Sequence, residues 1–156
     1  MRSLKQAQAV KQSCTEDSGS ATSLHRDCFA CGHVKHGLGM TFVRSGSDTV
    51  SAEWFCDERY QSYPGIVHGG IIATILDCAM TNCLLMKGIP AVTADMRIEY
   101  REPVRVGSVV TVNAWLVRSR PPLFVLGAEV IQDGQVTARA TAKFMRADVW
   151  SDVSRV

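Results

Sequence analysis

The hydrophobic residues of the chain predict one buried helix with strands on either side of it. Between His68 and Gly88, apolar side chains occupy most positions around a helical wheel, whereas a helix on a protein surface has one apolar stripe. A carboxylate, Asp77, lies on the same face as Thr74 and Thr81 in this segment. Burying an ionised Asp costs free energy unless it is paired or hydrogen-bonded, so Asp77 is the first candidate for a functional residue.

Alternation of apolar and polar residues predicts six strands. Before the helix, residues 40–44 and 49–55 form a predicted hairpin with a Ser-Gly-Ser-Asp turn. After the helix, the predicted strands lie at residues 92–101, 108–118, 123–131 and 136–144. In the first of these we expect Val92 and Ala94 on the covered face and Thr93 on the other face. In the last, we expect Thr137 on the polar face.

One helix with two strands before it and four after it predicts an α+β fold. We expect a curved antiparallel sheet of about five to six strands that wraps around one long central helix. The chain has 156 residues, the length of a single domain. We expect that domain at residues 24–146, with a flexible N-terminal arm at 1–23 and a polar tail at 147–156.

The composition of the chain argues against several classes of function. The net charge of +2 is small and the basic residues are scattered, which argues against nucleic acid as a partner. No stretch approaches the roughly 18 apolar residues of a membrane span, and the polar N-terminus does not look like a signal peptide. The six cysteines are therefore interpreted as free thiols in a reducing, cytoplasmic setting.

The segment Tyr60–Gly70, with Asp77 nine positions after His68, resembles the hotdog-fold thioesterases of the PaaI (phenylacetate-pathway) type. The segment Val92–Tyr100 is similar to the strand that follows the helix in that family, and the resemblance covers residues 28–146. It implies a hotdog fold and hydrolysis of acyl-CoA thioesters. It also implies a homodimer with one continuous sheet, often paired into a homotetramer.

Two residues are expected to carry the chemistry. The N–H of Gly69, at the positive end of the helix, is the natural donor to an oxyanion, although paired glycines can also serve only for close packing. Asp77 is expected to act as general base or as nucleophile, with pairing to Arg97 as the structural alternative. The two lie about 12 Å apart along a helix, too far to act on one carbonyl. The chemistry therefore requires Gly69 from one subunit and Asp77 from its partner.

The resemblance suggests further site residues. Thr93 lies where the family often has a hydroxyl near the carboxylate, although Thr is also common in strands. Ser62 lies where relatives often have Asn or another polar residue, and it is shorter than Asn. His68 and Gly70 flank Gly69 and are candidates for contacts with substrate, and His68 more often supports the loop in the family.

Basic residues after the helix are candidates for binding the phosphates of coenzyme A. We select Arg97 and Arg101, while a solvated strand face explains them equally well. Coenzyme A would arrive as part of the substrate, so no cofactor is expected.

Cys28 and Cys31, with His25, His33 and His36 nearby, are the right types of ligand for zinc. All five fall within twelve residues, however, and a structural zinc site usually takes a second ligand pair from elsewhere. We therefore expect a packed loop with free thiols and no metal, and we expect Cys78 on the helix to be a packing residue.

An acyl-CoA thioesterase is thus the first functional hypothesis. A hotdog hydro-lyase acting on an enoyl or hydroxyacyl thioester is a second, with His68 as its candidate base. A non-catalytic acyl-CoA-binding protein is a third, because Ser62 and Cys78 depart from the pattern of the family. Fold alone does not separate these three.

Overall fold

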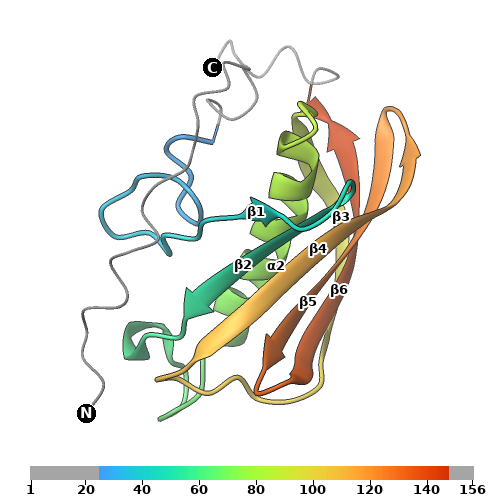
Figure 1. Ribbon diagram of the computed structural model, residues 1–156. Coiled ribbons are helices and arrows are strands. Elements are labelled where there is room, and N and C mark those ends of the chain that lie inside the picture. The colour runs from blue at the N-terminus through green and yellow to red at the C-terminus, as the bar shows by residue number, and fades with distance from the viewer. Residues whose placement is uncertain (1–24, 148–156) are drawn as a thin grey trace.

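The computed structural model describes residues 25–147 and contains one long helix packed against a six-stranded antiparallel sheet (Figure 1). The arm expected at residues 1–23 lies outside the described residues, as does the expected tail except for residue 147. Within residues 25–147, none of the helices has the length and apolar character needed to cross a lipid bilayer.

Helix α2 spans Gly69–Leu85. Ile75, Leu76 and Met80 are fully buried, which confirms the prediction of a helix inside the protein. The helix is followed by Gly88 with φ of 71°, a conformation that glycine adopts at little cost and that commonly terminates helices.

The strands form a single sheet in the order β1-β2-β4-β5-β6-β3. Their bounds are β1 Val43–Arg44, β2 Thr49–Phe55, β3 Ala91–Tyr100, β4 Val109–Arg120, β5 Leu123–Gln132 and β6 Gln135–Arg146. All neighbouring pairs are antiparallel. Figure 1 shows the sheet lying across one side of α2. The expected hotdog architecture is confirmed, and it leaves β3 at one edge of the sheet.

The core lies between α2 and the inner face of the sheet. Alternate residues of the strands supply its fully buried side chains, among them Val50, Val110, Val112, Phe124, Leu126, Val130 and Phe144. This alternation is the period-two pattern from which the strands were predicted.

The first strand is shorter than predicted. The sequence indicated residues 40–44, whereas β1 contains only Val43–Arg44. Met40 and Phe42 are buried, and the N–H of Met40 donates to the carbonyl of Ala30 at 3.0 Å. This segment therefore packs into the core and pairs with the preceding loop, and it does not extend the sheet.

Strand β3 contains a β-bulge that the sequence did not predict. Thr93 pairs with Phe144 and Asp95 pairs with Lys143, so Ala94 is an extra residue. Since Phe144 faces the helix, Thr93 faces it as well, and the prediction that Thr93 lies on the other face is wrong. Val92, expected on the covered face, is 44% exposed. One inserted residue reverses the alternation on one side of the bulge.

A second irregularity lies between β5 and β6. Val130 pairs with Ala138, but Ile131 pairs with Val136, so Thr137 is the extra residue. It is buried, not on the polar face as predicted, and its hydroxyl donates to the carbonyl of Val130 at 3.1 Å. The Thr137 carbonyl accepts the N–H of Arg101 at 2.8 Å and so fixes the chain where β3 ends.

Candidate active site

In the first turn of α2, one backbone N–H has no hydrogen-bond acceptor among the described residues. His68 caps the helix: its Nδ1 accepts the N–H of Gly70 at 2.9 Å, and its carbonyl accepts the N–H of Ile71 at 2.9 Å. Within residues 25–147, the N–H of Gly69 has no acceptor. This N–H lies at the positive end of the helix dipole, where an anion is stabilised. Gly69, and not Gly70, therefore offers the free donor that an oxyanion needs.

The cap defines the protonation of His68. Because the N–H of Gly70 donates to Nδ1, that nitrogen is unprotonated and the neutral ring carries its proton on Nε2. Nε2 can donate a hydrogen bond but cannot accept a proton. His68 therefore positions the start of the helix and is unsuited to act as a general base while the cap is formed.

Tyr100, at the end of β3, also contacts the start of the helix. Its hydroxyl donates to the carbonyl of Gly69 at 2.8 Å, and a Cβ added to Gly69 would lie 3.6 Å from its ring. Partial burial raises the pKa of the Tyr100 hydroxyl, so it remains a protonated donor at neutral pH. From the sequence, Tyr100 was placed only within the predicted strand at residues 92–101. The available signal was that a partly buried Tyr hydroxyl usually has a polar partner.

A cleft of about 360 Å³ opens beside Gly69. Its lining includes Ser62, Gly69, Ile72, Tyr100, Arg101 and Val104, and we call it the Gly69 cleft. Apolar side chains make up most of the wall, and Arg101 and Glu102 add one residue of each charge to the lining. The guanidinium of Arg101 lies 3.6 Å from the carboxylate of Glu99. Such a lining suits a small ligand with an apolar part.

Asp77 lies two turns further along α2 and contacts β3. The hydroxyl of Thr93 donates to Oδ1 of Asp77 at 2.5 Å, and within the described residues Oδ2 has no hydrogen-bond donor. Asp77 is half-buried, not enclosed. At the helical rise it lies about 12 Å from Gly69, and it does not line the Gly69 cleft. One oxygen of the carboxylate is therefore held in place, and the other is available to a water or a substrate.

The three remaining predicted residues lie in two places, the Gly69 cleft and the outer face of the sheet. Ser62 and Arg101 line the Gly69 cleft. Arg97 pairs with Thr141 on the outer face of the sheet, where its side chain is 83% exposed and lies 3.7 Å from the carboxylate of Glu99. One chain thus brings Ser62, Gly69 and Arg101 together, groups Asp77 with Thr93, and places Arg97 on the opposite side of the sheet.

The loop that carries Cys28 and Cys31 packs elsewhere on α2. The side-chain amide of Asn82 lies 3.4 Å from the sulfurs of Cys31 and Cys78. None of these four residues lines the Gly69 cleft.

Comparison with known proteins gives a consistent result. The sequence model of the family described as "Thioesterase superfamily" matches residues 64–147. The chain is 37% identical over 90 residues to acyl-coenzyme A thioesterase THEM4 of Mus musculus, a match that covers 56% of this chain and 39% of that protein. It is 28% identical over 108 residues to acyl-coenzyme A thioesterase 13 of Homo sapiens, covering 68% of this chain and 73% of that protein.

The fold is also shared with solved structures. The PaaI protein of the E. coli phenylacetic acid degradation operon superposes with a TM-score of 0.70 at 18% identity, covering 80% of this chain and 92% of that one. The chain spans well under half the length of the mouse THEM4 relative that it matches.

Proposed function

The chain belongs to the thioesterase superfamily, and from this membership we propose that it is an acyl-CoA thioesterase. Its substrate is a small or medium acyl-CoA, aliphatic or aromatic, which it hydrolyses to the free acid and coenzyme A. The names of the matched relatives support the substrate class. The observation that carries the proposal is the presence on one helix of a backbone donor without an acceptor in the described residues, Gly69, and a hydroxyl-bound carboxylate, Asp77.

Gly69 and Asp77 form two separate half-sites within one chain, and a second chain is needed to complete an active site. Gly69 and Asp77 are too far apart on α2 to act on one carbonyl. Each, however, is hydrogen-bonded to a different end of β3: Asp77 to Thr93 and Gly69 to Tyr100. A partner that places the two ends of β3 side by side would therefore bring the half-sites together.

The edge position of β3 supports such a partner. Among residues 25–147, β3 pairs only with β6, so its other edge of ten residues has backbone groups ready for a further strand. In an antiparallel pair of β3 strands related by a two-fold axis at the middle of the strand, the Thr93 end lies beside Tyr100 of the partner subunit. Asp77 then approaches Gly69 of the partner subunit. The bulge at Ala94 contributes, because it puts Thr93 and Tyr100 on the same face of the sheet.

The chemistry follows from these positions. The thioester carbonyl accepts a hydrogen bond from the partner's Gly69, which stabilises negative charge as the carbonyl carbon is attacked. Asp77 takes a proton from the attacking water, or attacks directly to form a mixed anhydride that water then hydrolyses. In either route the carbon–sulfur bond breaks, and the thiolate of coenzyme A leaves and takes up a proton.

The geometry favours hydrolysis over the hydro-lyase hypothesis. A hydro-lyase requires a base beside a carboxylate, and His68 was the candidate. Its Nδ1 is occupied by the N–H of Gly70 and its Nε2 carries the proton. The non-catalytic binding hypothesis differs from hydrolysis only in turnover, which the experiment below measures.

The oligomeric state, the cellular location and the residues that bind phosphate are part of the same proposal. We expect a homodimer through β3, with a homotetramer as a dimer of these dimers. The described cysteines form no disulfide, which supports a reducing, cytoplasmic location. Arg101, which lines the Gly69 cleft, is the stronger candidate for a phosphate of coenzyme A, while Arg97 could reach a ligand only from the outer face.

The test is hydrolysis of a panel of aliphatic and aromatic acyl-CoA thioesters by the wild type and by Asp77→Asn. Products are followed chromatographically, because the cysteines would react with a thiol dye. We expect turnover of at least one thioester by the wild type and a loss of roughly 10²–10⁴-fold in kcat for Asp77→Asn. Binding of the substrate should survive the substitution.

Asp95→Asn is the matched control, because Asp95 lies in β3 on the face away from the helix. It should retain the activity of the wild type. Binding of acyl-CoA without turnover by the wild type would favour the non-catalytic hypothesis, and equal rates for wild type and Asp77→Asn would remove Asp77 from the mechanism.

A further inference from the structure

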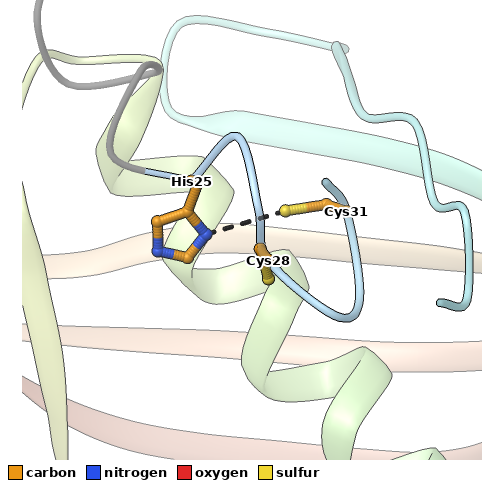
Figure 2. A group of neighbouring side chains, drawn as sticks. All are labelled: His25, Cys28 and Cys31. Atoms are coloured by element: carbon orange, nitrogen blue, oxygen red, sulfur yellow. Dashed lines mark hydrogen bonds between the residues drawn. The ribbon is translucent and has the colours of Figure 1, made fainter. Parts of the chain in front are cut away.

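Three side chains with metal-binding atoms converge in the loop before β1. Nδ1 of His25 and the sulfurs of Cys28 and Cys31 all lie within 4.8 Å of one another. Figure 2 shows the three side chains grouped beside α2, with the imidazole directed toward the sulfur of Cys31, a separation of 3.7 Å. Imidazole nitrogen and thiolate sulfur are the ligands that zinc prefers in proteins.

The backbone of the loop holds this arrangement. The N–H of Cys28 donates to the carbonyl of His25 at 3.1 Å, and the N–H of Gly32 donates to the carbonyl of Cys28 at 2.7 Å. A Cβ at Gly32 would lie 2.4 Å from both the carbonyl oxygen of Arg26 and the N of Cys28. Only glycine allows this close turn, so the spacing of the two cysteines is a property of the backbone.

A fourth ligand comes from the central helix. Nδ2 of Asn82 donates to the sulfurs of both Cys31 and Cys78, each at 3.4 Å, so one amide group contacts both sulfurs. Cys78 is 5% exposed and is far from the loop in sequence. It therefore supplies the distant ligand whose apparent absence favoured free thiols in the sequence analysis.

We propose that His25, Cys28, Cys31 and Cys78 bind one zinc ion, which fastens the loop to α2. Four protein ligands close a tetrahedral site, as in structural rather than catalytic zinc centres. With bonds of about 2.0 to 2.3 Å, ligand atoms lie about 3.5 to 3.8 Å apart. The atoms of His25, Cys28 and Cys31, within 4.8 Å of one another, therefore need side-chain shifts of only about 1 Å.

Binding at this site replaces protons with metal. Zinc displaces the protons of the thiols and is held by sulfur anions and a neutral imidazole, so protons are released to solvent. Asn82 remains as a donor to sulfur outside the ligand set, a role that orients ligands and tunes metal sites. The ion lies beside the turn of α2 that carries Asp77, and its contribution is to the structure of the loop and the helix.

The test begins with the zinc content of the full-length protein, purified reduced and without chelators from zinc-supplemented medium. We expect one zinc per chain in the wild type and its loss in Cys28→Ser and Cys31→Ser. Cys56→Ser and Cys83→Ser are matched controls that should keep the metal, because both cysteines are buried and neither belongs to the group of metal-binding atoms around Cys31. Cys14→Ser should also keep it; Cys14 lies outside the described residues.

X-ray absorption of the wild type gives an answer that does not depend on how the variants fold. We expect three sulfur ligands at about 2.3 Å and one nitrogen at about 2.0 to 2.1 Å. Removal of zinc with a chelator should lower the Tm of the wild type and leave that of Cys31→Ser unchanged.

Several results would overturn the assignment. Reduced protein that takes up no zinc, or equal zinc in the wild type and in Cys31→Ser, would exclude the site. Loss of zinc in Cys14→Ser with retention in Cys78→Ser would show that the fourth ligand is not Cys78.

Discussion

The hydroxyl of Thr93 donates a 2.5 Å hydrogen bond to Oδ1 of Asp77. The two residues come from different elements, β3 and α2, and they meet because the bulge at Ala94 turns Thr93 toward the helix. The bond fixes one oxygen of the carboxylate and leaves the other for chemistry. Thr93 is therefore a positioning residue for the proposed base.

Thr93→Val should lower kcat roughly ten- to a hundredfold, because an incorrectly positioned carboxylate costs rate even when it remains ionised. KM should change little, since Thr93 acts on the position of the Asp77 carboxylate. Thr93→Ser keeps the hydroxyl and should keep most of the rate. The measurement is steady-state kinetics with the best thioester of the panel, and an equal loss in the Val and Ser variants would contradict the role of the hydroxyl.

Gly69→Pro should remove the oxyanion donor without breaking the helix. Gly69 is the first helical residue, where proline is tolerated, and His68 has the extended conformation, φ −60° and ψ 133°, that proline requires of its predecessor. We expect kcat to fall by roughly 10²–10³-fold. Gly69→Ala is the control: its Cβ makes an ordinary contact with Tyr100 and its N–H remains. Circular dichroism checks the fold, and full activity in the Pro variant would exclude this donor.

Mixing the two inactive proteins should restore activity. A heterodimer of Asp77→Asn and Gly69→Pro contains one site with both defects and one site with neither. Random exchange in an equal mixture should therefore recover about one quarter of wild-type activity if the site spans the two-fold interface. Activity is measured after refolding the variants together and separately. A mixture no more active than its components would place the whole site within one chain.

Gly127→Ala should destabilise the protein through Trp115. The two residues are paired across β5 and β4, and a Cβ at Gly127 would lie 2.6 Å from the indole ring. We expect the free energy of unfolding to fall by about 1–3 kcal/mol, the usual range for overpacking. Denaturant unfolding of both single variants and the double variant with Trp115→Ala gives the coupling between them. If Gly127→Ala lowers the free energy of unfolding by the same amount in the Trp115→Ala background, the destabilisation has another cause.

The helix and most strand bounds could be predicted because their signals are local. Apolar residues around α2, the alternation in β4 and β5, and the Asp133–Gly134 turn with φ of 52° and 76° each depend on neighbouring residues. The candidate residues Gly69 and Asp77 came from a motif in one continuous stretch of chain. Asp77 does not line the Gly69 cleft, and the joint action of the two residues across a dimer stays a prediction.

The parts that could not be predicted depend on contacts between distant segments. The bulge at Ala94 cannot be recognised from the alternation of Val92, Ala94 and Met96, because it is defined only by the pairing of β3 with β6. The contact between Tyr100 and Gly69 joins a strand end to a helix start. Cys78 looked like a packing residue because its neighbour, Cys31, is brought to it only by the fold.

The bulge also means that the proposed site depends on the length of the chain as well as on the identity of its residues. Deleting Ala94 would leave Met96 to Tyr100 in place against β6 while turning Thr93 to solvent. A homologue could thus keep both Thr93 and Asp77 and still lose their contact through the loss of a single codon. Insertions and deletions in this strand, which substitution scores hardly register, are therefore the changes by which the family could gain or lose this arrangement in evolution.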